Sequence, residues 1–227
     1  MNTAIIVAAG TGSRFALTQP KQFVEILGKP LIIHTLERFE ACPLVDEIIL
    51  VLSLDGCSEF AKLNGHNEIK KLRSVATGGK TRAASVLNGL NRIDAAKAKI
   101  VAVHDGARPL VTVDEIARTI EKAAETGAAC LVADVSDTIK EIEGDFITGT
   151  IDRAGLRRAL TPQAFRYDIL RRAFDGVDLS ESITDECYLV EKLGVKIGLV
   201  EGSSRNIKIT RVEDIDMATV YLSGTGD

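Results

Sequence analysis

The sequence has no tryptophan, and aromatic residues make up only 4% of the chain. The core must therefore be aliphatic, and a hydrophobic fraction of 45% supplies enough side chains for it. No apolar run approaches the roughly 20 residues that a membrane-spanning helix needs. The N-terminus also lacks the basic and apolar regions of a signal peptide. We therefore expect a cytoplasmic protein that has no membrane partner.

Clustered cysteines and an excess of positive charge are also missing. Cys42, Cys57, Cys130 and Cys187 are widely spaced, no two of them form a C-x-x-C pair, and no histidine flanks them. This spacing speaks against a zinc site and predicts unpaired thiols in a reducing compartment. With 28 Lys and Arg against 32 Asp and Glu, the net charge is −4. The global basic field of a nucleic-acid-binding protein is therefore absent, and we expect no nucleic acid partner.

What the chain does contain is a regular alternation of short apolar runs with segments of helical periodicity. Strands are predicted at residues 4–9, 47–53, 72–77, 100–104, 129–135 and 195–201, and helices near residues 31–41, 59–63, 81–93, 113–126 and 182–193. Repeated β-then-α order implies parallel strands joined by right-handed crossovers. The predicted fold class is α/β, a doubly wound, mostly parallel sheet in a single domain over residues 1–227. Ligands of such sheets bind beyond the carboxyl ends of the strands.

One segment, residues 137–153 (DTIKEIEGDFITGTIDR), interrupts this order. Apolar and polar residues alternate on both sides of Glu143-Gly144-Asp145, which is typical of a β-hairpin with a glycine-containing turn. A two-stranded hairpin alone is only marginally stable in water, so it must pack against something else. A second copy of the protein is one candidate for that surface, and the hairpin's own sheet is the other.

The first predicted strand, residues 4–9 (AIIVAA), ends in the glycine turn G-T-G at residues 10–12. Arg14 and Lys21 follow the turn. Two cations beside a glycine turn outline a phosphate site, because glycines let backbone N–H groups approach an anion closely. The alternative is that both are solvated surface cations. A dinucleotide fingerprint fits less well, because Phe15 stands where a third glycine or alanine belongs.

A second strand, residues 100–103, delivers Asp105 to a strand end, with Arg108 in the turn that follows. An aspartate at a strand tip beside phosphates can orient Mg²⁺ or its bound waters. The alternative is that Asp105 is only a turn residue and Arg108 its partner. His104 between them is more typical of a packing or hydrogen-bonding residue than of a general base.

Five motifs in a fixed order carry a more specific signal. They are IVAAGTGSRF with PKQF, HDGARP, TPQAF (161–165), ITDE (183–186) and NIKIT (206–210). Over residues 3–221 the set resembles the 2-C-methyl-D-erythritol 4-phosphate cytidylyltransferase family of the non-mevalonate isoprenoid pathway. The resemblance implies a Rossmann-like domain of the nucleotide-diphospho-sugar transferase type, whose protruding β-arm (137–153) makes a homodimer. It also implies CMP transfer from CTP to methylerythritol phosphate, release of pyrophosphate, and Mg²⁺ as cofactor.

The resemblance further implies the residues of the site. For the nucleotide these are Ala8, Ala9, Gly10, Thr11, Gly12, Gly78, Gly79, Lys80, Ser85, Asp105 and Ala107. For the polyol phosphate they are Asp105, Arg108, Thr138, Arg153, Thr161, Thr184 and Lys208, with Thr138 and Arg153 supplied by the partner's arm. Arg14, Lys21, Arg153 and Lys208 would be the catalytic cations. Mg²⁺ would lie mainly on the CTP phosphates, with Asp105 as a candidate ligand. Family members often have an acidic residue where Lys80 stands, so only backbone contacts are expected to be shared there.

Four other functions fit parts of the pattern. A ribitol 5-phosphate cytidylyltransferase would share the CTP half of the site, and a sugar-1-phosphate nucleotidyltransferase would usually carry an additional C-terminal region. An NAD(P)-binding oxidoreductase conflicts with Phe15 and with the paired cations. A non-catalytic nucleotide-binding protein would bind CTP and release no pyrophosphate. The chain length predicts a monofunctional enzyme without a fused cyclase domain.

Overall fold

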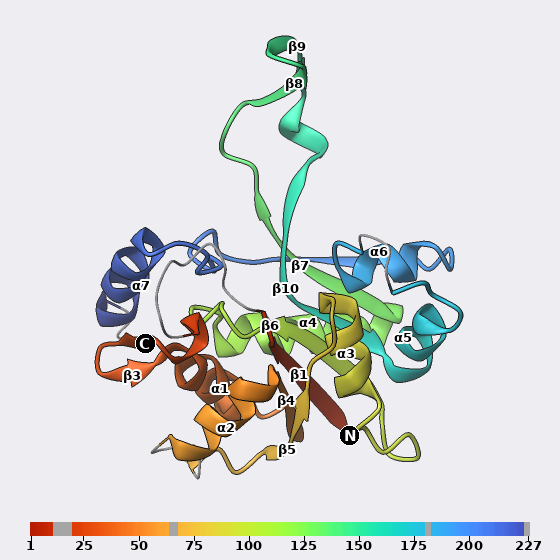
Figure 1. Ribbon diagram of the computed structural model, residues 1–227. Helices are drawn as coiled ribbons and strands as arrows, with labels where there is room; N and C mark the ends of the chain where they lie inside the picture. The colour runs from red at the N-terminus through yellow and green to blue at the C-terminus, as the bar shows by residue number, and fades with distance from the viewer. Residues whose placement is uncertain (11–19, 64–67, 180–182, 225–227) are drawn as a thin grey trace.

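The computed structural model describes residues 1–10, 20–63, 68–179 and 183–224. Its central strands are β1 (Asn2–Ala8), β4 (Glu47–Leu52), β5 (Leu72–Thr77), β6 (Ile100–Asp105), β7 (Ala128–Asp134), β10 (Arg157–Arg166) and β11 (Gly198–Glu201). They form one sheet in the order β11-β7-β10-β6-β1-β4-β5 (Figure 1). Among these strands only β10 is antiparallel to its neighbours, β6 and β7. The predicted mostly parallel sheet is confirmed.

Helices cover both faces of this sheet, which makes it doubly wound. One apolar cluster joins the sheet to α1 (Leu31–Ala41), α2 (Leu54–Lys62) and α4 (Val113–Thr126). The cluster on the opposite face joins it to α3 (Arg82–Leu90), α5 (Tyr167–Phe174) and α6 (Glu186–Glu191). Because β1 is covered on both sides, Ile5 and Ile6 are both fully buried although they point to opposite faces. None of the helices described is long and apolar enough to cross a membrane.

The sequence sets the bounds of α4 and uses the same residues to hold a distant segment. The Thr112 hydroxyl accepts from the Glu115 amide at 3.1 Å, and the Glu115 carboxylate accepts from the Thr112 amide at 2.8 Å, a capping box. The helix ends at Gly127, whose φ of 92° suits glycine. Glu115 also accepts from the backbone of Ser203 at 2.6 Å. It thereby fixes the start of the extended segment that leads to Lys208.

Several elements differ from the prediction. Strand β10 was not predicted, and neither were α5, α7 (Glu213–Gly224) or the small β2–β3 pair (Glu25–Ile26, Lys29–Pro30). Strand β11 begins at Gly198, three residues later than expected. Helix α7 packs on β2 through a third apolar cluster that includes Ile26, Ile209 and Ala218. This cluster seats the NIKIT segment against the body of the protein.

The predicted hairpin is present as β8 (Ile139–Glu143) and β9 (Phe146–Ile151), with Gly144 in the turn at φ 57°. It forms a two-stranded sheet of its own and projects from the ends of β7 and β10, well away from the body (Figure 1). The hairpin therefore does not pack on its own sheet. The pairing of Ile139 with Ile151 puts Thr138 and Arg153 at its base.

Candidate active site

A cleft of about 680 Å³ opens at the carboxyl ends of β1, β4, β5 and β6. Its size lies within the range of about 300–1,000 Å³ that is usual for small-molecule sites. Among the predicted site residues, Ala8, Ala9, Gly10, Lys21, Gly78, Gly79, Lys80, Ser85, Asp105, Ala107 and Lys208 line it. These residues come from five separate segments, which meet where a doubly wound sheet is expected to bind its ligand.

Two glycines form the narrow wall of the cleft after β5. A Cβ on Gly78 would lie 2.3 Å from the Cβ of Ala9, and one on Gly79 would lie 2.5 Å from the Cβ of Ala84. Neither position therefore accommodates a side chain without movement of the backbone. The Ser85 hydroxyl accepts from the Gly79 amide at 3.1 Å and fixes the turn. The result is a backbone surface that a flat ligand can approach closely.

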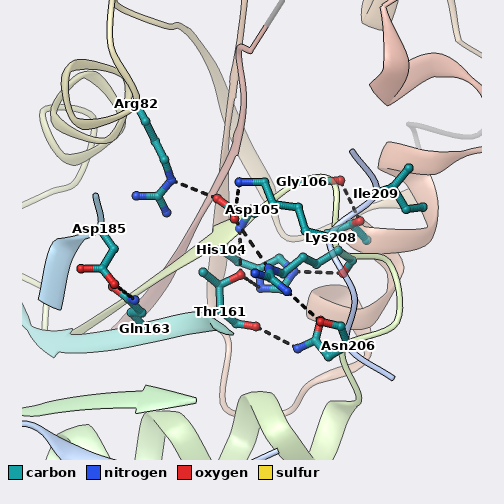
Figure 2. Close-up of polar contacts among 12 residues, drawn as sticks. Arg82, His104, Asp105, Gly106, Thr161, Gln163, Asp185, Asn206, Lys208 and Ile209 are labelled. Atoms are coloured by element: carbon teal, nitrogen blue, oxygen red, sulfur yellow. Dashed lines mark hydrogen bonds and ion pairs between the residues drawn. The ribbon is translucent and has the colours of Figure 1, made fainter. Parts of the chain in front are cut away.

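Asp105, at the tip of β6, is surrounded by three cations (Figure 2). One carboxylate oxygen lies 3.0 Å from Nε of Arg82, and the other lies 2.8 Å from Nζ of Lys208 and 3.6 Å from Nε of Arg108. Burial alone would raise the pKa of Asp105, but Arg82 and then Lys208 outweigh it and hold that pKa well below its ordinary value. Asp105 is therefore ionised and orders the cations around it.

Lys21 and Lys208 meet on the same wall of the cleft. Lys21 belongs to a short 3-10 helix, Lys21–Phe23, and its Nζ donates to the Ile209 carbonyl at 2.9 Å. The Ile209 amide donates in turn to the Ala107 carbonyl at 2.9 Å, which ties the segment to the loop after Asp105. The carbonyl of the residue after Lys208 thus holds the ammonium group of Lys21. Such a pair can receive two phosphate groups side by side.

His104 supports Asp105 from behind and is completely buried. Its Nε2 lies 3.1 Å from the Arg108 carbonyl, which can only accept, so Nε2 carries the proton. Nδ1 then accepts from the Thr161 hydroxyl at 3.0 Å, and that hydroxyl accepts from the Asp105 amide at 3.1 Å. Burial lowers the pKa of His104 to about 3. His104 is therefore a neutral hydrogen-bonding residue, as its sequence context favours.

This burial predicts a specific pH dependence of stability. In the unfolded chain His104 binds a proton below about pH 6.5, whereas in the native protein it does so only below about pH 3. Acid therefore favours the unfolded state. Between pH 7 and pH 5 this difference removes about 2 kcal/mol from the free energy of unfolding. We expect His104→Gln to reduce the loss over this interval by that amount, measured by urea denaturation at both pH values. Equal losses in the two proteins would show that His104 is not held neutral.

The other predicted residues that the structure describes do not line the cleft. Arg108 is behind Asp105, where its Nη1 donates to the Asn206 carbonyl at 2.7 Å. Thr161 is buried, and the structure uses its hydroxyl on His104 and Asp105, so its contact with substrate stays a prediction. Thr184 is exposed just before α6, and Thr138 and Arg153 are exposed on the arm, where Arg153 donates to the Ser136 carbonyl. Thr11, Gly12 and Arg14 fall outside the described residues.

Comparison with known proteins agrees with this geometry. The family model described as IspD: 2-C-methyl-D-erythritol 4-phosphate cytidylyltransferase matches residues 2–224. The chain belongs to this family. The protein of that name from Geobacter metallireducens is 39% identical over 225 residues, which cover 96% of each chain.

Two further proteins bear on the extent of the likeness. The crystal structure of the cytidylyltransferase from Francisella tularensis superimposes with a TM-score of 0.80 at 33% identity and covers 97% of this chain and 99% of that one. The bifunctional enzyme IspD/IspF of Desulfotalea psychrophila is 41% identical over 222 residues, 97% of this chain but 57% of that relative. The chain thus spans a little over half the length of the bifunctional relative and nearly all of the other two.

The structure adds residues to this cytidylyltransferase site that sequence reasoning missed. Arg82 lines the cleft, and its Nη1 lies 2.7 and 2.9 Å from the two carboxylate oxygens of Glu186. Asn206 donates to the Thr161 carbonyl at 3.0 Å and so fastens the NIKIT segment to β10. Asn206 belongs to the NIKIT motif, and Arg82 lies between Lys80 and Ser85, two residues assigned to the nucleotide, so these positions were the one available signal. Their partners could not be read from it.

The donors available to a metal ion are few. Asp105 is the one carboxylate among the described residues that line the cleft. The described part of the chain contains no cluster of three or more His, Cys, Asp or Glu side chains able to hold a metal. Mg²⁺ at phosphate sites usually keeps several waters and takes one or two carboxylates besides the phosphates. The residues present therefore fit an ion carried mainly by the substrate's phosphates.

Proposed function

We propose that the cleft is where this cytidylyltransferase transfers CMP from CTP to 2-C-methyl-D-erythritol 4-phosphate, giving 4-diphosphocytidyl-2-C-methyl-D-erythritol and pyrophosphate. The reaction is that of the family. The observation that supports its place here is that Lys208 and Arg82 meet around Asp105, in the same cleft as Lys21 and the paired glycines. The proposal takes residues 1–227 as one domain with the arm inserted in it.

The nucleotide is assigned to the side of the cleft formed by β1, β5 and α3. The backbone after β1 and the glycine wall at Gly78 and Gly79 offer N–H groups and close approach to a base and ribose. Lys80 is exposed at the rim, so its backbone is the expected contact. The roles of Thr11, Gly12 and Arg14 on the CTP phosphates stay predictions from the sequence. We assign Lys21 to the α-phosphate, which its position in the lining of the cleft supports.

The chemistry follows from charge. A phosphate oxygen of the polyol phosphate forms a bond to the α-phosphorus of CTP, and the bond from that phosphorus to the oxygen bridging to the β-phosphate breaks. Pyrophosphate leaves with the electron pair, and proton transfer is not required. Because both reactants are anions, the enzyme must hold them in line and neutralise the added charge. Lys21 and Lys208 do this, and the described lining of the cleft holds neither His nor Cys.

Mg²⁺ is part of the same proposal. Bound to the CTP phosphates, with Asp105 as the candidate protein ligand, the ion would neutralise phosphate charge and orient the leaving group. Asp105 already contacts Lys208 and Arg82, so its main role in this chain is to order those cations. The protein side of the reaction is then carried by cationic side chains in fixed positions.

The polyol phosphate is assigned to the side of the cleft near Lys208, Arg108 and Thr184. Thr138 and Arg153 are proposed to reach this side from the arm of a second subunit. Both lie at the base of a hairpin that extends away from its own body, and neither lines the cleft of its own chain (Figure 1). An arm reaching across a dimer would complete the site with a further cation.

We predict that Phe146→Asp converts a dimer into monomers. Phe146 is 78% exposed, with Ile142 and Ile147 exposed beside it, and an apolar tip of this kind is typical of an interface. Sedimentation velocity would show the change in mass. The matched control is Val220→Asp, because Val220 on α7 is also an exposed apolar residue, and it should remain dimeric. A dimer that survives Phe146→Asp would place the interface elsewhere.

The proposed reaction is tested by measuring pyrophosphate release with CTP and Mg²⁺, in parallel with methylerythritol 4-phosphate and ribitol 5-phosphate. We expect a large preference for methylerythritol phosphate. A preference for ribitol phosphate would leave the CTP side intact and overturn the assignment of Arg153 and Thr184. Binding of CTP without release in either case would mean that the chain binds nucleotide and does not transfer it.

A further inference from the structure

Glu186, in the ITDE motif, has no role in the reaction as described above. Its side chain has no exposed surface, and Arg82 is its charged partner, with Nη1 at 2.7 and 2.9 Å from its oxygens. A buried carboxylate is costly unless it is paired and hydrogen-bonded. Burial raises the pKa of Glu186, and Arg82 opposes that shift. An ion pair in such a place calls for a reason beyond stability.

The backbone that carries Glu186 is held in place by β10. Gln163 is 1% exposed, and its side-chain amide donates to the Asp185 carboxylate at 2.8 Å (Figure 2). Its amide oxygen accepts from the Cys187 backbone amide at 3.1 Å. Asp185 also caps α6 by accepting from the Tyr188 amide at 3.0 Å. The residues on both sides of Glu186 are thus fixed to the central sheet. Its carboxylate is an immobile anchor.

Arg82 connects this anchor to the cleft. Nη1 of Arg82 points to Glu186, while its Nε donates to one oxygen of Asp105 at 3.0 Å. Burial disfavours the charge of Arg82, but Glu186 and then Asp105 outweigh it and raise its pKa above the ordinary value. The second oxygen of Asp105 is left for Lys208 at 2.8 Å. Each oxygen of Asp105 thus has one close cationic partner.

We propose that Glu186 is a positioning residue, which holds Arg82 on one oxygen of Asp105 so that the other oxygen fixes the ammonium group of Lys208 in the cleft. The expected effect on kcat rests on the proposed function. The placement of Lys208 is a property of the protein without substrate. The chain of contacts runs from β10 through α6 and α3 to β6, and each contact is 3.1 Å or shorter.

The consequence of losing the anchor follows from the geometry. In Glu186→Gln the guanidinium of Arg82 loses the anion at Nη1 and is no longer held in one orientation. Its N–H groups then compete for both oxygens of Asp105, and Lys208 loses its fixed partner. A displacement of a charged group by about 1 Å can cost up to roughly 10²-fold in rate. We therefore expect kcat of Glu186→Gln to fall by about 10- to 100-fold.

A double-mutant comparison with Lys208 distinguishes a positioning role of Glu186 from a general loss of structure. In a Lys208→Met background, adding Glu186→Gln should change kcat by less than about twofold, because the group that it positions is already gone. The matched control is Leu189→Ala, on the same helix and 1% exposed. It should lower the melting temperature, and it should not show the loss of kcat that we expect for Glu186→Gln. An equal loss from Glu186→Gln in both backgrounds would overturn the proposal, as would a folded Glu186→Gln enzyme of normal kcat.

A second readout does not depend on activity. The rate at which an amine-acylating reagent labels Lys208, followed by peptide mass spectrometry, reports how firmly Asp105 holds its ammonium group. Glu186→Gln should raise this rate severalfold and leave that of Lys80, in the same cleft, unchanged. Unchanged labelling of Lys208 would overturn the proposal. If the wild-type protein released no pyrophosphate, the proposed function would fail while the labelling result still decided the role of Glu186.

Discussion

Lys21→Ala is expected to lower kcat by about 10²–10³-fold and to weaken CTP binding far less, because it removes a preorganised charge that acts mainly in the transition state. The Lys21 ammonium is fixed against the Ile209 carbonyl at 2.9 Å and faces the cleft. It therefore needs little reorganisation as negative charge builds up at the α-phosphorus. Steady-state kinetics with methylerythritol phosphate, together with calorimetric titration of CTP, separate the two effects.

The structure offers a closely matched control for this variant. Lys71 also donates from Nζ to a backbone carbonyl, that of Cys42 at 2.7 Å. It lies just before the amino end of β5, whereas the cleft lies at the carboxyl end of that strand. Lys71→Ala removes the same chemical group and should leave kcat near the wild-type value. Near-normal turnover in Lys21→Ala would contradict the role given to it. An equal drop in both variants would show that loss of structure is the cause.

The second large effect is a recovery of activity. Lys21→Ala and Arg153→Ala subunits are each expected to be nearly inactive alone, because each lacks one charge at every site. If Arg153 acts across the dimer, a mixed dimer has one site with both residues intact. Random exchange of equal amounts makes half of the dimers mixed, so about one quarter of wild-type activity should return. Pyrophosphate release after exchange measures it.

A second mixture tests this interpretation. Lys21 and Lys208 line the cleft of the same chain, so a mixed dimer of Lys21→Ala and Lys208→Ala subunits has one cleft without Lys21 and one without Lys208. That mixture should therefore recover no activity, and it is the negative control for the Arg153→Ala mixture. No recovery for the Arg153→Ala mixture after confirmed exchange would place Arg153 in its own subunit's site. Differently tagged subunits, isolated as mixed dimers, show how much exchange has taken place.

The sequence predicts the part of the fold whose pattern is local. Strands β1, β4 and β6 are short apolar runs because both faces of each are covered, and the hairpin shows the alternation that is typical of a two-stranded sheet with one apolar face. Strand β10 has no such pattern. It contains Pro162, which argues against a central strand when only the sequence is seen, and the structure accommodates it where the register on β7 shifts between Ala159 and Gln163. It becomes a central strand because it pairs with β6 on one side and β7 on the other.

The same limit applies to the site. Cations and glycines near strand ends could be recognised because their types and local spacing match phosphate chemistry. The pair of Arg82 and Glu186 could not, because its members are 104 residues apart and meet only when α3 and α6 pack on the same face of the sheet. Thr161 shows the reverse case. Its motif suggested contact with substrate, which stays a prediction, while the contacts of its hydroxyl with His104 and Asp105 could be learned only from the structure.

The central claim is that fixed cations promote a single in-line displacement at the α-phosphorus, without a covalent intermediate on the protein. It is tested most directly by the stereochemistry of the reaction with CTP that carries sulfur at the α-phosphorus in one configuration. A single displacement predicts inversion of configuration at phosphorus in the product. Retention would require two displacements, with a protein side chain holding CMP in between, and would contradict the account.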